Sequence, residues 1–466
     1  MVLHQVMSED LNRMSKPLWR IQREAIDYCL KNPNAMLNMD MGTGKTRVAI
    51  EVIMKLNCHN ILVIAPKSVV PVWKTEVDKY AKDKYDVLLL GNGTLKSRCK
   101  RFDDFMKNGD KRKVVVINYD VVWRSEIYSR VSCLSWDIVI LDESHRAKSH
   151  ISKTSKACFR IGKSAERRLC LSGTPMANSP LDIFGQYRFL DQSIFGTRWG
   201  DFKEKYAVLG GPERRFIVGF KNLEELGERF NSIAFTATKA DISKEAELVD
   251  EPEIVVRFGE MPKTTRKIYE DLRRDFISDW KGGIITASNV LVRLLRFQQL
   301  TSGFTCVSDI DEKESEYTML DNVKINLLSE LLEDLPISEP VVVFYKFRND
   351  LMNIRSIKTE RRVYELSGNR NESEKWKKDL NGILAVQYQA GSEGVDLTYS
   401  NYLVYYSLTH SLMQYDQSMA RVHRPNQKKV VTVMHLIIEN SIDEEMLLSL
   451  RNKRNIIQDV MENGRI

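Results

Sequence analysis

The chain has 466 residues, a length that accommodates two or three domains, each with its own hydrophobic core. Its 43% hydrophobic and 29% charged residues are typical of a globular protein, and its net charge of +7 is compatible with a polyanionic partner. The seven cysteines are scattered without a Cys-x-x-Cys pair, which argues against a zinc site and against a disulfide framework.

The first predicted element is an amphipathic helix that starts near Leu18 and carries apolar residues at helical spacing. Gln22 in this helix precedes a glycine-rich segment. Its amide can both donate to and accept from an adenine edge. We therefore assign Gln22 to ATP binding, and the alternative is an ordinary polar residue of the helix.

The glycine-rich segment at residues 39–46 predicts a nucleotide-phosphate loop, because an apolar run precedes it and a helical pattern follows it. Its two glycines let backbone N–H groups face phosphate oxygens. Its lysine can neutralise the β- and γ-phosphates, and the last threonine can ligate Mg²⁺. The general pattern has glycine where Met39 stands. The residues that we assign to ATP binding here are Met41, Gly42, Thr43, Gly44, Lys45 and Thr46.

Continuous apolar runs at residues 60–65 and 113–118 predict buried parallel strands. Lys67 and Ser68 follow the first run closely. In open α/β sheets, ligands bind beyond the carboxyl ends of the strands. These two side chains are therefore placed to contact the backbone of a polymer.

A further apolar run at residues 136–141 ends in Asp142 and Glu143. Two adjacent carboxylates directly after a buried strand are costly unless they hold a metal or take part in chemistry. Asp142 is the predicted second-sphere or direct Mg²⁺ partner, together with Thr46. Glu143 is the candidate base that polarises the attacking water. The alternative is a solvated acidic turn.

The next strand, at residues 168–171, leads into a tight turn whose hydroxyls can link the γ-phosphate site to a nucleic-acid groove. The residues of the front half that we assign to this coupling are His145, Ser172, Gly173 and Thr174.

In the second half, apolar runs at residues 340–344, 382–386 and 402–406 predict three more strands. A glycine-rich segment follows the second of them. Its glycines would let the backbone approach a phosphate or ribose closely, so Gly394 is assigned to ATP binding. Asp396 is assigned with it, since a carboxylate there can hold nearby hydroxyls or an arginine.

Arg421 and Arg424 are spaced i and i+3, so on a helix both guanidiniums leave one face. That face can point across a cleft at the γ-phosphate bound on the other half. Arginine suits this role because its planar fork stays charged and binds phosphate bidentately. The alternative is a pair of arginines on a solvated helix.

The ordered set of these motifs resembles the superfamily-two helicases. The segment at residues 172–184 in particular is similar to the Swi/Snf-type, chromatin-remodeller-like branch of DNA-dependent ATPases, in a minimal form like those of bacteria or phages. The chain differs from that branch at Ala237 and Thr238, where a pair of arginines is usual, and at Asp396, where asparagine is common.

The resemblance implies an α/β fold of two RecA-like parallel-sheet lobes around a nucleotide cleft, with helical insertions. We expect the ATP-binding lobe at residues 1–245 with a helical insert at about 178–240, a linker and helical protrusion at 246–320, and the second lobe at 321–466. ATP and Mg²⁺ are the implied cofactors. The expected catalytic residues are Lys45, Asp142, Glu143, Arg421 and Arg424, and Gln417 is expected to join the coupling residues. The expected nucleic-acid contacts are Lys67, Ser68, Asn118, Ser367, Gly368 and Thr398.

The main hypothesis is an ATP-dependent motor that translocates on double-stranded DNA. One alternative is a true strand-separating DNA or RNA helicase, including one that acts on branched DNA. The other is a nucleotide-regulated DNA-binding or recruiting subunit with negligible turnover. No apolar run approaches the length of a membrane span and no signal-peptide pattern is present, so we expect a monomeric cytoplasmic protein, associated with the nucleoid in a bacterial or phage setting.

Overall fold

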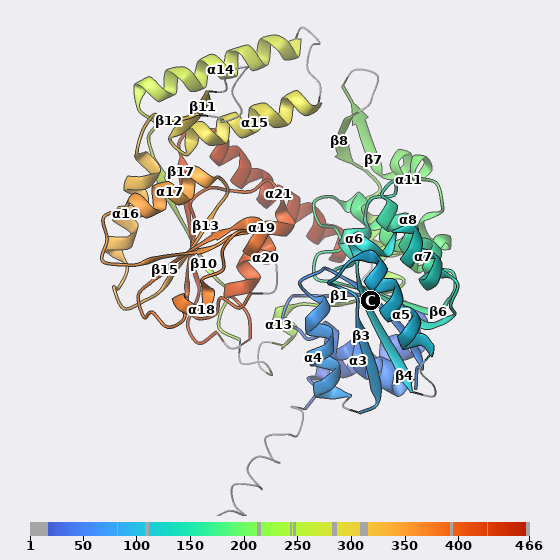
Figure 1. Ribbon diagram of the computed structural model, residues 1–466. Helices are drawn as coiled ribbons and strands as arrows, with labels where there is room; N and C mark the ends of the chain where they lie inside the picture. Colours follow the sequence, from blue (N-terminus) through green and yellow to red (C-terminus); the bar gives the residue numbers. More distant parts are fainter. Residues whose placement is uncertain are drawn as a thin grey trace, which may run out of the picture. The chain divides into compact units, whose positions relative to one another are not determined.

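Two units make up the protein in the computed structural model, which describes residues 17–81, 83–107, 111–211, 216–242, 245, 248–281, 287–307, 316–391, 395–425 and 427–462. The first unit comprises Met1–Glu247 and Asn455–Ile466, and the second comprises Leu248–Arg454. Figure 1 shows a sheet with surrounding helices in each unit. Among the described residues, no helix is long and apolar enough to cross a membrane.

The first unit is built on a parallel sheet whose described strands lie in the order β3-β4-β2-β5-β6-β1-β9. The strands are β1 Asn34–Met39, β2 Asn60–Ala65, β3 Tyr85–Leu89, β4 Arg112–Asn118, β5 Trp136–Asp142, β6 Ala165–Ser172 and β9 Ala234–Ala237. The central strands are apolar along most of their length because a parallel sheet is covered on both faces. The strands predicted in the front half are therefore confirmed.

Short helices connect these strands and position the motifs. They are α2 Arg20–Lys31, α3 Lys45–Lys55, α4 Val70–Tyr80, α5 Leu95–Lys107, α6 Tyr119–Val122, α7 Ser125–Ser132, η1 Ser144–Ala147, α8 Lys153–Gly162 and α13 Lys239–Ile242. The predicted helix behind the glycine-rich segment is α3, which begins at Lys45 and buries Val48, Val52 and Ile53.

The segment at 178–240, expected to be a helical insert, contains more than helices. Its helices are η2 Pro180–Asp182, α9 Ile183–Leu190, α10 Gln192–Phe195, α11 Trp199–Tyr206 and α12 Leu223–Asn231. Phe202 packs between Phe184 and Phe195, with ring centroids 5.0 and 5.3 Å apart. The segment also forms an antiparallel hairpin of β7 (Ala207–Gly210) and β8 (Phe216–Phe220), and it ends in β9, which pairs with β1 in the main sheet.

The second unit has a parallel sheet in the order β10-β17-β16-β13-β15-β14 among its described residues. The strands are β10 Glu253–Gly259, β13 Val341–Tyr345, β14 Val363–Leu366, β15 Ile383–Gln387, β16 Tyr402–Tyr405 and β17 Thr432–Ile438. The segment 246–320 was expected to be a linker and protrusion, yet it supplies β10 to this sheet. Both units are thus α/β structures with parallel sheets, which confirms the predicted fold class.

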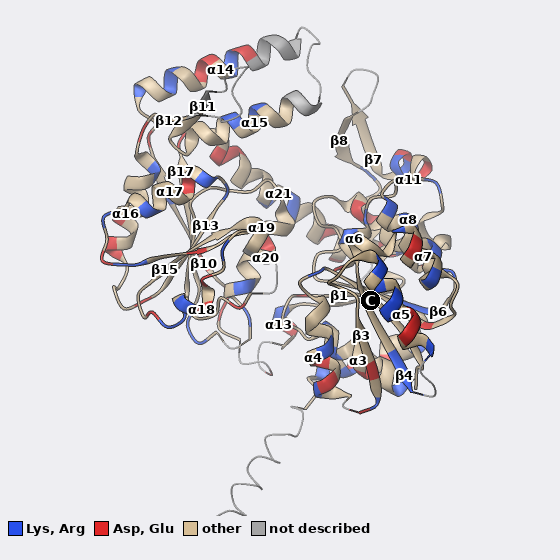
Figure 2. Ribbon diagram, viewed as in Figure 1, with Lys and Arg blue, Asp and Glu red and all other residues tan. Residues whose placement is uncertain are grey.

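The described helices of the second unit are α14 Lys263–Lys281, α15 Ala287–Thr301, α16 Val323–Asp334, α17 Arg348–Ser356, α18 Ser373–Trp376, α19 Tyr388–Gly391, α20 Leu412–Val422 and most of α21 Ile442–Glu462. A small antiparallel pair of strands adjoins them, formed by β11 Phe304–Val307 and β12 Glu316–Met319. A buried ion pair ties three of these elements together. Lys324 Nζ of α16 lies 2.8 Å from Asp443 of α21, which also accepts a hydrogen bond of 2.9 Å from Thr301 Oγ1 of α15. Basic and acidic residues are interspersed on the surface helices, as along α14 in Figure 2.

Candidate nucleotide and nucleic-acid site

The loop after β1 turns at two glycines and opens helix α3. Gly42 and Gly44 have φ values of +89° and +87°, in the left-handed region that favours glycine. A Cβ atom built on Gly44 would lie 2.4 Å from Nε2 of Gln22, so a side chain here would displace the amide of Gln22. The backbone therefore leads into the N-terminus of α3 in a shape that suits phosphate binding.

Lys45 occupies the first turn of α3, and its ammonium folds back over the loop. Nζ donates to the carbonyl oxygens of Met39 at 2.7 Å and Asp40 at 3.2 Å. The buried Thr43 closes the same turn, because its Oγ1 donates to the Asp40 carbonyl at 2.7 Å. Met41 and Thr46 are partly exposed beside these groups.

Gln22 is buried on α2, with its amide engaged at both ends. Its Oε1 accepts from the backbone N–H of Trp19 at 3.1 Å, and its Nε2 donates to the carbonyl of Thr43 at 3.0 Å. The structure therefore places Gln22 against the phosphate loop. The contact with an adenine base stays a prediction.

Asp142 ends β5 in a buried position where its oxygens already have donors. The indole Nε1 of Trp73 donates to Oδ2 at 2.8 Å, and the backbone N–H of Glu143 donates to Oδ1 at 3.0 Å. Burial, followed by the charge of Glu143, raises the pKa of Asp142 to about 6, whereas the bond from Trp73 and the charge of Lys45 lower that pKa.

Glu143 has a left-handed backbone, with φ of 51°. Its Oε2 is buried without a hydrogen-bond partner among the described residues and lies 3.4 Å from Nδ1 of His145. A non-glycine residue held at positive φ is uncommon and is often associated with functional sites.

The turn after β6 lies directly against the phosphate loop. A Cβ atom on Gly173 would lie 3.1 Å from the carbonyl oxygen of Met39. Ser172 Oγ accepts from the backbone N–H of Thr174 at 3.1 Å and lies 3.3 Å from Nδ1 of His145. The structure therefore brings together the four coupling residues predicted in the front half.

The residues at this edge of the sheet fit a magnesium–nucleotide complex. Asp142 and Thr46 provide the oxygen ligands that Mg²⁺ prefers. Two buried atoms, Oε2 of Glu143 and Oγ1 of Thr174, have no hydrogen-bond partner in the described part of the chain. Unsatisfied buried polar atoms are rare, and a ligand at this edge is one explanation for them.

In the second unit, Arg421 lies near the end of α20, but Arg424 lies beyond it. The helix ends at Val422, and His423 has an extended backbone with φ of −90° and ψ of 93°. The side chain of His423 is buried, with Nε2 3.3 Å from the carbonyl oxygen of Val249. The prediction that both arginines leave one helical face is therefore wrong, because the buried histidine interrupts the helix between them.

Gln427 fixes the turn that follows Arg424. Its Nε2 donates to the carbonyl oxygens of Ser400 at 2.8 Å and Thr398 at 3.2 Å. The backbone N–H of Gln427 donates to the carbonyl of Arg424 at 3.0 Å. Gln417, the predicted coupling residue of α20, is buried.

Asp396 accepts two hydrogen bonds from the nearby Thr398, and its assignment to ATP binding stays a prediction. Its Oδ1 accepts from Thr398 Oγ1 at 2.9 Å and from the Thr398 backbone N–H at 3.1 Å. Thr398, predicted to contact nucleic acid, is thus oriented by a local turn. Gly394 lies outside the described residues.

The other predicted nucleic-acid contacts differ in accessibility. Lys67 is exposed and Ser68 partly exposed directly after β2. Asn118 is 2% exposed, and its Oδ1 accepts from Arg98 Nη1 at 3.2 Å. A direct contact by Asn118 would require these neighbours to move.

Ser367 and Gly368 form a turn after β14. Ser367 Oγ accepts from the backbone N–H groups of Asn369 and Arg370 at 3.2 and 3.3 Å. Gly368 is exposed, with open space where a Cβ would lie. This turn is therefore accessible to a large ligand.

The sequence analysis did not assign Trp73 in the first unit or Lys346 in the second. Trp73 donates to Asp142, a partner 69 residues away that no local pattern reveals. Lys346 follows β13, and its Nζ donates to Oε1 of Gln298. Burial lowers the pKa of Lys346 to about 8. The signal that identified Lys67, a cation just after an apolar strand, could have identified Lys346.

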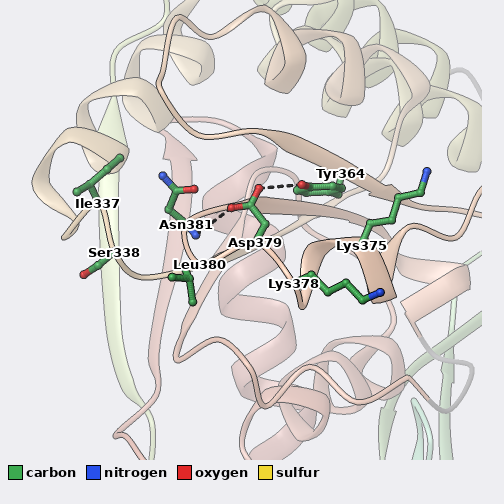
Figure 3. A pocket seen from close by; sticks show the side chains of 8 residues that line it. All are labelled: Ile337, Ser338, Tyr364, Lys375, Lys378, Asp379, Leu380 and Asn381. Atoms are coloured by element: carbon green, nitrogen blue, oxygen red, sulfur yellow. Dashed lines mark hydrogen bonds between the residues drawn. The ribbon is translucent and has the colours of Figure 1, made fainter.

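A cavity of about 670 Å³ lies elsewhere in the second unit. Figure 3 shows its lining, with the hydroxyl of Tyr364 bonded to Asp379 at 2.8 Å and the two lysines Lys375 and Lys378 beside it. Its residues at 379–381 precede β15, whereas the residues assigned to nucleotide and nucleic acid follow their strands. The cavity is therefore separate from the site predicted for this unit.

Comparison with known proteins identifies two domains. A model of the "SNF2-related domain" matches residues 11–304, and a model of the "Helicase conserved C-terminal domain" matches residues 323–426. Protein p41 of Acyrthosiphon pisum secondary endosymbiont phage 1 is 26% identical, over 93% of this chain and 94% of its own length. The ISWI chromatin-remodeling complex ATPase ISW1 of Saccharomyces cerevisiae is 24% identical, over 91% of this chain and 38% of its own length.

The chain spans less than half the length of several of the curated relatives that it matches. Among solved structures, the Sulfolobus solfataricus SWI2/SNF2 ATPase core in complex with dsDNA is similar. It has a TM-score of 0.44 and 21% identity, with 96% of this chain and 94% of that chain covered.

Proposed function

This chain belongs to the SNF2-related family and carries a helicase C-terminal domain, and on that premise we propose that it is a DNA-dependent ATPase that translocates along double-stranded DNA. One observation carries the proposal. The phosphate loop, the Asp142–Glu143 pair and the turn at 172–174 meet at one edge of the first sheet, because Gly173 closely approaches the loop and both Ser172 and Glu143 contact His145.

In the proposed reaction, the loop N–H groups and Lys45 bind the phosphates of ATP, and Thr46 and Asp142 hold Mg²⁺. When bound, the ion neutralises charge that develops on the phosphate oxygens. Glu143 orients the attacking water and accepts its proton, a role that suits its buried Oε2, which has no hydrogen-bond partner among the residues that the structure describes.

The second unit is proposed to complete the reaction with Arg421 and Arg424, which stabilise charge on the γ-phosphate. An arginine of this kind supplies a factor of about 10³ to 10⁵ in rate in related phosphoryl transfers. Repeated gripping and release of the DNA backbone by exposed groups such as Lys67 and Gly368 would then produce movement. Because phosphate contacts dominate, we expect binding with steep salt dependence and little sequence preference.

The test is ATPase activity with double-stranded DNA, single-stranded DNA, RNA or no polymer, followed by a triplex-displacement assay. We expect the largest stimulation by double-stranded DNA and ATP-dependent displacement of the third strand. Stimulation by RNA alone would refute the DNA assignment. An undetectable rate under every condition would instead support a nucleotide-regulated recruiting subunit.

One observation favours strand separation as a second candidate function. The β7–β8 hairpin exposes apolar side chains, with Val208, Phe216 and Val218 40%, 45% and 64% exposed. In Figure 1 it projects from the helices of its own unit. Exposed apolar patches mark interaction sites, and a wedge against a terminal base pair needs such a surface. Unwinding of a forked duplex that Phe216→Ser abolishes without loss of ATPase would establish this candidate.

We further propose a monomeric protein of the cytoplasm or nucleoid. Sedimentation with and without DNA would test the oligomeric state.

A further inference from the structure

Trp73 lies on α4 with a fully buried side chain, a short distance after the turn that carries Lys67 and Ser68. Its indole Nε1 donates to Oδ2 of Asp142 at 2.8 Å. The other carboxylate oxygen accepts from the backbone N–H of Glu143 at 3.0 Å. The carboxylate assigned to Mg²⁺ is therefore held from two sides, once by its own chain and once by α4.

The partner of Trp73 differs from those of the other fully buried tryptophans in the described part of the chain. Trp136 donates to the carbonyl of Val131 and Trp376 to the carbonyl of Gly382, each at 2.9 Å. A buried indole N–H needs an acceptor, and a main-chain carbonyl is sufficient for that purpose. The use of a carboxylate gives a stronger, charge-assisted bond and fixes the orientation of an ionisable group.

The indole itself is held firmly. The backbone N–H groups of Val69 and Val70 both donate to the carbonyl of Pro66, at 2.9 and 3.2 Å, and the N–H of Trp73 donates to the carbonyl of Val69 at 3.3 Å. The turn and the first part of α4 thus form one hydrogen-bonded segment. A donor on such a segment has little freedom to follow a carboxylate that rotates.

We propose that Trp73 is a positioning residue that holds the carboxylate of Asp142 in the orientation required to bind magnesium with a nucleotide. This inference rests on the proposed function for the identity of the ligand. The indole does not contact the ligand itself; it restricts the rotation of the group that does. Hydrogen-bond partners of metal ligands contribute in this way, and their loss costs about 10- to 100-fold in metal affinity.

The test compares Trp73→Phe with Trp136→Phe, which removes a buried indole bond of similar length from the same unit. The affinity of each full-length variant for a fluorescent ATP analogue is measured with saturating Mg²⁺ and with EDTA. We expect Trp136→Phe to keep the wild-type ratio of the two affinities. In Trp73→Phe, the gain in nucleotide affinity that Mg²⁺ provides should fall about 10-fold, and the affinity in EDTA should equal that of the wild type.

An unchanged ratio in Trp73→Phe, or an equal loss in Trp136→Phe, would overturn the inference. If Trp73→Phe does not fold, ¹⁹F spectra of wild-type protein labelled with 5-fluorotryptophan replace it. The Trp73 resonance should then shift when Mg²⁺ is added to the nucleotide-bound protein, and the Trp136 resonance should not. A Trp73 resonance that stays in place would overturn the inference as well.

The two proposals can fail separately. If the wild type binds the nucleotide with Mg²⁺ but no polymer stimulates hydrolysis, the motor function fails and the role of Trp73 stands. If hydrolysis is stimulated by double-stranded DNA and the affinity ratio of Trp73→Phe is unchanged, only the role of Trp73 fails.

Discussion

Replacing Gly44 with alanine should weaken ATP binding through two separate effects. An L-residue at the observed φ of +87° costs about 1–2 kcal/mol. The new Cβ would also lie 2.4 Å from Nε2 of Gln22, which forces that amide off the carbonyl of Thr43 and costs about 1 kcal/mol. The sum of about 2–3 kcal/mol corresponds to about a 30- to 150-fold loss of affinity if ATP binding has to restore the loop.

A titration with a fluorescent ATP analogue measures this loss, and a double-mutant cycle with Gln22→Ala separates the two effects. In the Gln22→Ala background, the loss of affinity caused by Gly44→Ala should be about fivefold smaller, because the steric clash with the amide is gone. The loss that comes from the backbone conformation should remain. Gly200→Ala in α11 is the control, since open space surrounds the position where its Cβ would lie. Wild-type affinity together with a wild-type melting temperature in Gly44→Ala would refute the reasoning.

Three further changes test other parts of the site and fold. Glu143→Gln should bind ATP but release phosphate at least about 100-fold more slowly, because an amide does not accept the proton; wild-type turnover would remove Glu143 from the role of base. Arg424→Ala should bind DNA normally in gel shifts and lose about 10³-fold in ATPase rate, and retained activity would transfer the role to Arg421. Burial lowers the pKa of His435 to about 4, below its unfolded value of about 6.5. The contribution of the neutral His435 to the free energy of unfolding is therefore fully present above pH 6.5 and is lost as the pH drops toward 4. In urea unfolding, moving from pH 7 to pH 5 should cost the wild type about 2 kcal/mol more than His435→Gln, and equal losses would contradict the buried neutral histidine.

The central strands could be predicted because burial on both faces leaves a continuous apolar run. The edge strands lack that signal. β10 lies at the end of its sheet, where Ile254 and Phe258 are 46% and 52% exposed, and charged residues interrupt its sequence. β9 has four residues and also lies at an edge. Their absence from the prediction explains why the boundaries of the insert and of the second unit were placed differently.

The site shows the same division between local and distant information. The phosphate loop is a contiguous segment, so its glycines, Lys45 and Thr46 could be identified together. The bond between Trp73 and Asp142 joins segments 69 residues apart, and only the fold reveals it. Asn118 was assigned as the last residue of a predicted strand, but its environment, including the buried Arg98, is set by tertiary packing.

For the arginines of the second unit, the sequence motif did not predict the local backbone geometry. The i, i+3 argument assumed that a helix sets the direction of Arg424, yet the helix has ended and His423 is buried between the two arginines. The backbone around Arg424 instead lies between the buried His423 and Gln427, whose N–H donates to the Arg424 carbonyl and whose side chain donates to two carbonyls of the neighbouring loop. A residue held in this way depends on tertiary contacts that helix propensity does not influence. The proposed contact of Arg424 with a phosphate therefore depends on the turn that Gln427 closes with its N–H bond to the Arg424 carbonyl.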